Sequence, residues 1–336
     1  MKHIYLLIET VCIFFISACN QLPGNLVINT NVKLLGNSSV LFTKDCNSYL
    51  YDIQITDSFI VVLDSKSDSV MQVHTLKDSQ PADIFCLRNG DNNRLISPQF
   101  VQSDYRSKNV GNQLSVVDNG IYLKDITLSN TGININSIIL DRRLRKSVDY
   151  NITSKEIFAV PITDYKKFCF YFYNSDSGYY WVDTPPAIIK DMPKVSMALI
   201  NNLCVNETSK SIVSAFRFTN YVTFYDLQGN IKTNYKFGEQ TFIPFQSENK
   251  IDVINSVKCF TSIYSTSKYV YCLYDGSTDF TASSKILVFK WNGKHVKTWQ
   301  VDRNLRCLAV DKNNRYLYAI SSNPAGGQDI LRYALK

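Results

Sequence analysis

Residues 222–237 read Val222-Thr-Phe-Tyr-Asp-Leu-Gln-Gly-Asn-Ile-Lys-Thr-Asn-Tyr-Lys-Phe237, and residues 286–301 read Ile286-Leu-Val-Phe-Lys-Trp-Asn-Gly-Lys-His-Val-Lys-Thr-Trp-Gln-Val301. In both, a run rich in β-branched and aromatic residues leads into a polar turn that contains glycine. A second run follows, with Ile or Val, Lys, Thr and an aromatic residue in the same order. Two such runs around a short turn are typical of a β hairpin.

The same style of sequence extends from Leu26 to the end of the chain. Apolar and polar residues alternate, and Gly, Asn, Asp or Ser interrupts the alternation every six to ten residues, as around the runs 59–63, 168–173 and 285–289. No stretch of about a dozen residues has the apolar spacing of an amphipathic helix. The chain is therefore predicted to be all-β.

Four short strands form a unit that recurs at roughly 40–65 residues, which is the signature of propeller blades. We place six units at residues 47–90, 98–140, 154–200, 201–238, 254–301 and 304–336. The last unit contains only three strand-like runs, and the segment 26–43 contains two that belong to no unit. We predict a six-bladed β-propeller with four-stranded blades over residues 26–336, closed into a ring by the N-terminal segment. A pair of two-sheet sandwiches is the alternative, but it gives no reason for the repeat.

Residues 1–18 have the features of an export signal: Lys2 and His3, an apolar run over 4–16, then small residues. The apolar run is too short to cross a bilayer of about 30 Å. The ending Ile16-Ser-Ala-Cys19 resembles a bacterial lipobox, in which the cysteine thiol receives the lipid. We predict lipid attachment at Cys19 and a tether over residues 19–25. An ordinary signal peptide with an unmodified Cys19 is the alternative.

The residues after Cys19 indicate an expected cellular location, by resemblance to other lipoproteins. Asn20 is not the aspartate that commonly retains lipoproteins in the inner membrane, and residues 21–25 lack the acidic run of a surface-export signal. We therefore expect an outer-membrane lipoprotein on the periplasmic face, with surface exposure left open.

The chain has 36 Lys and Arg against 29 Asp and Glu, a net charge of +7. Loss of residues 1–18 removes Lys2 and Glu9 and leaves this charge unchanged. Because an exported protein does not meet nucleic acid in its working compartment, we expect no nucleic-acid partner. Anionic headgroups, lipopolysaccharide or acidic glycans suit the charge, and a solvated surface of mixed charge is the alternative.

Seven cysteines follow Cys19, at positions 46, 86, 169, 204, 259, 272 and 307, with no CxxC spacing. Most lie in apolar runs, where a free cysteine behaves as a small hydrophobic residue. We predict buried thiols, with Cys259 and Cys272 as the one pair that a hairpin could bring together.

Catalytic motifs are scarce. The sequence contains no GxSxG, P-loop, HExxH or GxGxxG motif, and the mature chain has only His74 and His295, on or beside strands of different blades. Propeller lactonases bind Ca²⁺ through oxygen ligands at the channel mouth, but no run here matches a DxDxDG calcium loop. We expect no cofactor, no metal site and no catalytic residues, and a binding role is favoured over an enzymatic one.

Arginines gather in the connections from each outer strand to the next inner strand, the face on which propellers usually bind. The candidates for binding an anion or a partner are Arg94, Arg142, Arg143, Arg145, Arg303 and Arg306. Guanidinium groups suit carboxylates, phosphates and sulfates because they donate forked hydrogen bonds. A solvated charge run is the alternative. Tyr179, Tyr180 and Trp181 are candidates for stacking on sugars or anchoring a protein, against the alternative of strand packing.

The lipobox followed by a six-unit β repeat resembles the TolB-like six-bladed propeller lipoproteins of Gram-negative gut anaerobes, relatives in shape of the NHL-repeat propellers. The resemblance is carried by residues 286–294, 308–320 and the Gly- and Asn-rich connection 87–98, and it extends over nearly all of the mature chain. It implies an architecture and an envelope address but no reaction.

The sequence predicts a lipid-anchored envelope propeller that acts as a binding or scaffolding module. Its expected partners are the membrane, through lipid on Cys19, and an envelope protein. The alternatives are a Ca²⁺-dependent propeller hydrolase and a protein that binds an anionic glycan or a small ligand.

Overall fold

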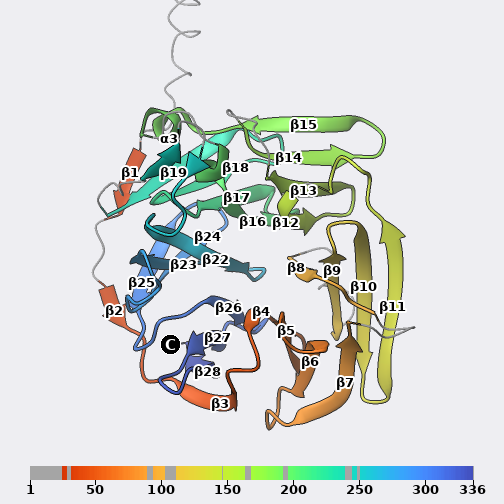
Figure 1. The fold of residues 1–336 in the computed structure, drawn as a ribbon. Helices are drawn as coiled ribbons and strands as arrows, with labels where there is room; N and C mark the ends of the chain where they lie inside the picture. The colour runs from red at the N-terminus through yellow and green to blue at the C-terminus, as the bar shows by residue number, and fades with distance from the viewer. Residues whose placement is uncertain are drawn as a thin grey trace, which may run out of the picture.

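The computed structural model describes residues 25–28, 32–88, 94–102, 111–145, 147–162, 168–191, 196–238, 244–247 and 250–335. Six sheets, each with four antiparallel strands as its basic unit, are arranged in a ring (Figure 1). The prediction of an all-β, six-bladed propeller is confirmed. The export signal over 1–18 and the lipid-attachment candidate Cys19 lie outside the described residues.

The first blade contains β4 (Leu50–Ile55), β5 (Phe59–Asp64), β6 (Ser69–Thr75) and β7 (Pro81–Leu87). The second contains β8 (Pro98–Val101), β9 (Gln113–Asp118), β10 (Tyr122–Ser129) and β11 (Gly132–Ile139). The third contains β12 (Ser147–Ile152), β13 (Glu156–Pro161), β14 (Phe168–Asn174) and β15 (Gly178–Asp183).

The fourth blade contains β16 (Asn201–Asn206), β17 (Ser211–Phe216), β18 (Tyr221–Tyr225) and β19 (Ile231–Phe237). The fifth contains β22 (Lys258–Ser265), β23 (Tyr269–Ser277), β24 (Lys285–Lys290) and β25 (His295–Gln300). The sixth contains β26 (Cys307–Val310), β27 (Tyr316–Ser322), β28 (Gln328–Ala334) and, from the N-terminal segment, β3 (Ser39–Lys44). A hairpin of β20 (Phe245–Ser247) and β21 (Lys250–Ile251) lies between the fourth and fifth blades in the sequence.

The third unit was placed too late by the sequence pattern, at 154–200. Its innermost strand is β12, and residues 186–191 and 196–199 form the short helices α3 (Pro186–Asp191) and η1 (Ser196–Leu199) instead of a strand. The run 147–152 mixes Ser, Asp and Asn with apolar residues because one side of an innermost strand faces the channel, so its pattern looks like a loop. Among the described residues, no helix is both long and apolar enough to cross a membrane.

The N-terminal segment closes the ring as predicted and also adds a strand to each of two other blades. Strand β3 pairs antiparallel with β28, so it supplies the missing outer strand of the sixth blade. Before that, β1 (Asn25–Ile28) pairs parallel with β19, and β2 (Val32–Leu34) pairs parallel with β25. The segment therefore follows the outer rim of the fourth, fifth and sixth blades in order, as the red and orange strands of Figure 1 show.

The repeat that defines the fold depends on glycines in left-handed turns. Gly229 and Gly293 occupy the same place in the two quoted hairpins and have φ of +84° and +85°. A residue without Cβ adopts this conformation at little steric cost. Neighbouring blades then pack face to face, as in the contact between Phe224 and Phe289, whose ring centroids lie 5.4 Å apart. Local turn chemistry and inter-blade packing thus favour the same structure.

Most of the cysteine prediction is confirmed. The described cysteines are not joined in disulfides, and six of the seven are buried, namely Cys86, Cys169, Cys204, Cys259, Cys272 and Cys307. Cys46 is exposed, because it lies in a turn before the first blade. Cys272 stands opposite Ile263 in the sheet, so it does not face Cys259.

Candidate functional site

The first strands of the six blades contact one another around the channel and line a cavity of about 500 Å³. Every blade contributes residues to its wall. The charged side chains of the wall are Asp52, Asp149, Arg217 and Arg306. Pockets that bind small molecules commonly have volumes of about 300 to 1,000 Å³, so this cavity has the size of a ligand site.

The cavity opens on one end of the ring, as the chain positions of its rim residues indicate. Ser97, Ile200 and Arg306 lie in connections from an outer strand to the next innermost strand. Asn119 and Arg217 lie in turns between the second and third strands of a blade. In an antiparallel blade both kinds of connection lie at the same end of the sheet. We call this end of the ring the loop face.

Asp52 and Asp149 occupy equivalent places in the first and third blades. Each follows an irregularity in the pairing of its innermost strand, which turns the side chain toward the channel. Asp149 Oδ2 accepts a hydrogen bond from Leu203 N of the next blade at 2.6 Å, and its Oδ1 accepts one from Tyr150 N at 2.8 Å. Asp149 therefore joins two neighbouring blades and also lines the cavity.

The counterpart, Asp52, accepts through Oδ1 from Ile53 N at 2.9 Å and is also hydrogen-bonded by the backbone amide of Phe100 in the second blade. Other innermost strands use polar side chains in the same way. Asn202 Nδ2 donates to Phe260 O at 3.0 Å, and Gln99 Nε2 donates to Val148 O. Polar side chains near the start of the innermost strands therefore join neighbouring blades around the channel.

Both aspartates are difficult to ionise. Their carboxyls are partly buried in the cavity wall, and the loss of hydration raises the pKa of Asp52 and of Asp149 to about 7. The backbone N–H groups that donate hydrogen bonds to the two carboxyls lower the pKa of each. For Asp149, the nearby charge of Asp52 raises the pKa and that of Arg217 lowers it. Near pH 7 both carboxyls are therefore incompletely ionised.

Arg217 follows β17 directly and is held at the channel mouth by its backbone. Its N donates to Ile200 O at 2.8 Å, and its O accepts from Cys259 N at 2.7 Å. The side chain keeps a large exposed surface on the cavity. Within the described ranges, no hydrogen bond or ion pair engages its guanidinium. Desolvation lowers the pKa of Arg217 while Asp149 raises it, but an arginine stays charged at ordinary pH.

Arg306 lines the same cavity from the connection before β26. Its Nη2 donates to Ser322 Oγ at 3.3 Å, and its guanidinium carbon lies 5.1 Å from the ring centroid of Phe280. Its Nε is buried and has no hydrogen-bond partner in the described chain. Buried polar groups are usually paired, so Arg306 retains unused donor capacity beside the cavity.

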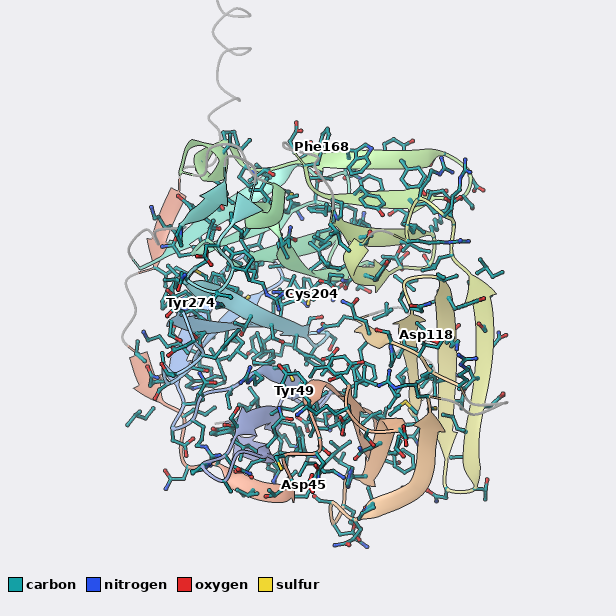
Figure 2. The ribbon with its side chains drawn as sticks, viewed as in Figure 1. Asp45, Tyr49, Asp118, Phe168, Cys204 and Tyr274 are labelled. Carbon is teal, nitrogen blue, oxygen red and sulfur yellow. The ribbon has the colours of Figure 1, made fainter. Side chains whose placement is uncertain are left out.

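Gln102 crosses the channel nearer to the other end of the innermost strands. Its Nε2 donates to Ile263 O in the fifth blade at 2.5 Å, and its Oε1 accepts from Cys204 Sγ in the fourth blade at 3.1 Å. Cys204 lies near the centre of the ring in Figure 2. Because the second and fifth blades are opposite in a ring of six, Gln102 reaches across the channel.

The six predicted arginines are placed as follows. Arg94 and Arg142 are exposed. Arg143 forms an ion pair with Asp141, with Nε to Oδ1 at 3.1 Å, and its guanidinium carbon lies 4.2 Å from the ring centroid of Tyr179. Arg145 donates from Nε and Nη2 to Leu140 O.

The remaining two predicted arginines, Arg303 and Arg306, come together because both contact Ser322. Arg303 forms an ion pair with Asp329, with Nη2 to Oδ2 at 2.7 Å, so part of its donor capacity is used. Of the six candidates, Arg306 is the one that lines the cavity. Whether any of them binds an anion stays a prediction.

The aromatic candidates pack within the third blade. Tyr180 stacks on Phe172 with ring centroids 5.0 Å apart, and the Trp181 ring lies 4.7 Å from that of Tyr171. Both keep some exposed surface. Strand packing is therefore their observed use.

Neither histidine lines the cavity. His74 stacks on Phe42 with ring centroids 3.9 Å apart, and burial lowers its pKa to about 4. His295 Nε2 lies 3.0 Å from Thr298 Oγ1. In the part of the chain that the structure describes, no group of three or more His, Cys, Asp or Glu side chains is placed to hold a metal ion.

Sequence reasoning did not find Asp52, Asp149 or Arg217. The available signal for the aspartates was a carboxylate at the third residue of the innermost strand in two blades. For Arg217 it was a basic residue immediately after the buried run 211–216. Neither signal identifies a site until the blades are placed around the channel.

Comparisons with known proteins agree with this architecture. A family model described as TolB-like 6-blade propeller-like matches residues 33–313. A search of curated proteins found no match. Among solved structures, a member of the DUF4221 family from Bacteroides vulgatus is 12% identical, with a TM-score of 0.56, over 90% of this chain and 95% of that chain. A Bacteroides fragilis protein described as exported is 11% identical, with a TM-score of 0.53, over 93% and 99%. At these identities the likeness shows the fold alone.

Proposed function

The chain belongs to the TolB-like six-bladed propeller family, and from this premise we propose that it is a lipid-anchored envelope module that binds a protein partner on its loop face. The apolar run over residues 4–16 and the lipobox ending at Cys19 support export and anchoring. Several acyl chains on one cysteine give stable membrane attachment, since each buried CH₂ contributes about 0.8 kcal/mol. We place the protein at the outer membrane, facing the periplasm.

The observation that carries the binding role is the open, charged cavity at the centre of the loop face, and exposed apolar side chains lie in two connections on the same face. Ile254 is 76% exposed in the connection between the fourth and fifth blades, and Ile189 is 41% exposed on α3 in the preceding connection. Exposed apolar residues beside polar groups are typical of protein interaction sites.

The apolar connection is tied to the channel mouth by hydrogen bonds. Lys258 Nζ donates to Val253 O and to Ile254 O, each at 2.8 Å. The next residue, Cys259, donates its N–H to Arg217 O. Ile254 and Arg217 are thus linked through one short segment, so a partner that covers one can reach the other.

Cross-linking in intact cells, followed by purification of the tagged protein and mass spectrometry, tests this role. We expect one envelope protein in near-stoichiometric amount with the wild type, and its loss with Ile254→Ser. Val296→Ser is the matched control, because Val296 is 38% exposed on β25 beside the turn that follows β24, at the end of the blade opposite the loop face. Equal recovery with both variants would contradict a partner on the loop face.

The anchor is tested separately by growth with an alkyne-tagged fatty acid. The wild type is expected to carry the label in the outer-membrane fraction, and Cys19→Ala is expected to carry none and to leave the membrane. An unlabelled wild-type protein would remove the lipid anchor from the proposal and leave the binding role to be judged by the cross-linking.

A further inference from the structure

Arg217 combines a backbone held by hydrogen bonds with a charged guanidinium that has no partner within the described ranges. Hydrogen bonds to Ile200 O and from Cys259 N hold its backbone between the third-to-fourth connection and the fifth blade. Arg217 lines the 500 Å³ cavity, and its guanidinium has no hydrogen-bond or ion-pair partner within the described ranges. A planar guanidinium donates two parallel hydrogen bonds to a carboxylate.

The charges of the wall set the charge of a suitable ligand. Arg217 and Arg306 contribute two positive charges, while the raised pKa of Asp52 and of Asp149 leaves the two carboxyls incompletely ionised near pH 7. The wall therefore favours an anionic ligand.

The tyrosine and cysteine side chains of the cavity wall stay neutral between pH 5 and 9. Desolvation raises the pKa of Tyr51 and of Cys307 well above their ordinary values, and that of Tyr150 to about 12. Lys258, behind Arg217, remains tied by Nζ to three backbone carbonyls, and its pKa is lowered mainly by desolvation. The two aspartates are therefore the groups of the wall whose charge changes in this range.

We propose that the channel mouth is a carboxylate-binding site in which Arg217 holds the carboxylate and the carboxyls of Asp52 and Asp149 face the rest of the ligand. The inference rests on the proposed binding role of the loop face and names the chemistry recognised there. The cavity is larger than a carboxylate group, and Asn202 and Thr261 add polar wall, so the ligand carries further polar groups. The same chemistry is present in a small sugar acid and in an acidic side chain of a protein partner.

Binding to the purified protein by calorimetry separates the two sources. One arm compares D-glucuronate with D-glucose, and the other compares the peptide acetyl-Ala-Glu-Ala-amide with acetyl-Ala-Gln-Ala-amide. We expect the acid of at least one pair to bind and its uncharged match not to bind, and the tighter acid identifies the source. Absence of binding by both acids up to about 10 mM overturns the proposal, because affinities weaker than millimolar do not define a site.

Variants of Arg217 test the assignment. Arg217→Gln is expected to weaken acid binding by at least about tenfold, because it removes a charge-assisted hydrogen bond. Arg217→Lys keeps the charge without the forked geometry and is expected to have intermediate affinity. Arg315→Gln is the control, since Arg315 is exposed in the turn between β26 and β27, at the other end of the ring. Unchanged binding in both Arg217 variants overturns the assignment.

The pH dependence has a defined sign. Protonation of Asp52 and Asp149 removes negative charge from the wall, so the acids are expected to bind on the order of tenfold more tightly at pH 6 than at pH 8. Tighter binding at pH 8 overturns the proposed charge balance. All of these measurements use the purified protein without a partner. A failure here is thus distinct from a failure to recover a partner in cells.

Discussion

Asp149 accepts a hydrogen bond from the backbone N–H of Leu203 at 2.6 Å, and the two residues belong to neighbouring blades. The same carboxyl lines the central cavity and lies near the charge of Arg217. Asp52 has the corresponding relationship with Phe100. Inter-blade stability and the chemistry of the channel are therefore coupled through the same two side chains.

The pH dependence of stability follows from these carboxyls. The pKa of each is about 7 in the folded protein and near 3.9 in the unfolded chain, so the folded state binds more protons between these values. The resulting stabilisation is fully present below about pH 4 and is lost as the pH rises through 7. As the pH rises from 5 to 8, we expect the ionisation of each aspartate to lower the free energy of unfolding by about 2 kcal/mol.

Urea unfolding at pH 5, 6, 7 and 8 measures this slope. Asp52→Asn removes one titrating group and is expected to flatten the decrease by about half, whatever its effect at a single pH. The control is Asp226→Asn, because Asp226 caps an exposed turn through hydrogen bonds to Gln228 N and Asn230 N. An identical slope in Asp52→Asn and the wild type would rule out Asp52 as a source.

The two turn glycines are expected to differ in their tolerance of a side chain. Both have left-handed backbone, which costs an alanine about 1 kcal/mol. A Cβ on Gly229 would lie 2.6 Å from Val182 Cγ2 in the third blade, whereas the nearest atom to a Cβ on Gly293 is 3.4 Å away. Gly229→Ala therefore adds an overpacking cost of about 1 to 3 kcal/mol.

Thermal unfolding compares these variants directly. Gly229→Ala is expected to melt several degrees below Gly293→Ala, and the further change Val182→Ala is expected to recover part of the loss in the Gly229 background. Equal melting temperatures for the two single variants would show that the third blade yields to the added methyl group.

The sequence predicted the fold well because its signals are local. Strand alternation recurs in each blade, and turn glycines such as Gly229 and Gly293 mark hairpins without reference to distant residues. The three-stranded last unit also indicated that an N-terminal strand completes the ring. By contrast, β1 and β2 add parallel strands outside the repeat, and parallel pairing over three or four residues leaves no recurring pattern.

The candidate site was harder to predict because it is assembled across blades. Asp52, Asp149 and Arg217 are separated by most of the first four blades in the sequence and meet only at the channel. The visible signal was the basic run around Arg142 and Arg143, and Arg143 proves to be paired with Asp141. A charge run is conspicuous in a sequence, whereas a single charge placed by the fold is not.

Thiol reactivity distinguishes the exposed cysteine from the buried ones. Burial raises the pKa of Cys86 and of Cys169 to about 12, so these thiols form little reactive thiolate. We expect a thiol reagent to modify one described cysteine, Cys46, in the native protein and all seven after denaturation. Cys46→Ser is expected to abolish the native reaction, and rapid modification of that variant would mean that a buried thiol becomes accessible.

The N-terminal rim strands are expected to contribute unequally. A chain starting at Gly36 lacks β1 and β2 but keeps β3, whereas one starting at Cys46 also lacks β3. Strand β3 pairs with β28 along its length, and its Phe42 packs on His74 of the first blade, so its loss opens the ring between the last and first blades. The edges of β19 and β25 remain attached to complete four-stranded blades in either chain.

We therefore expect the Gly36 chain to unfold cooperatively, with a melting temperature a few degrees below that of the mature protein. The Cys46 chain is expected to aggregate or to lose its cooperative transition, because an unpaired β28 exposes a strand edge. Calorimetry and size-exclusion chromatography on both chains decide between them. A cooperative, monomeric Cys46 chain would mean that packing between the blades, without the strand from the N-terminal segment, is sufficient to hold the ring closed.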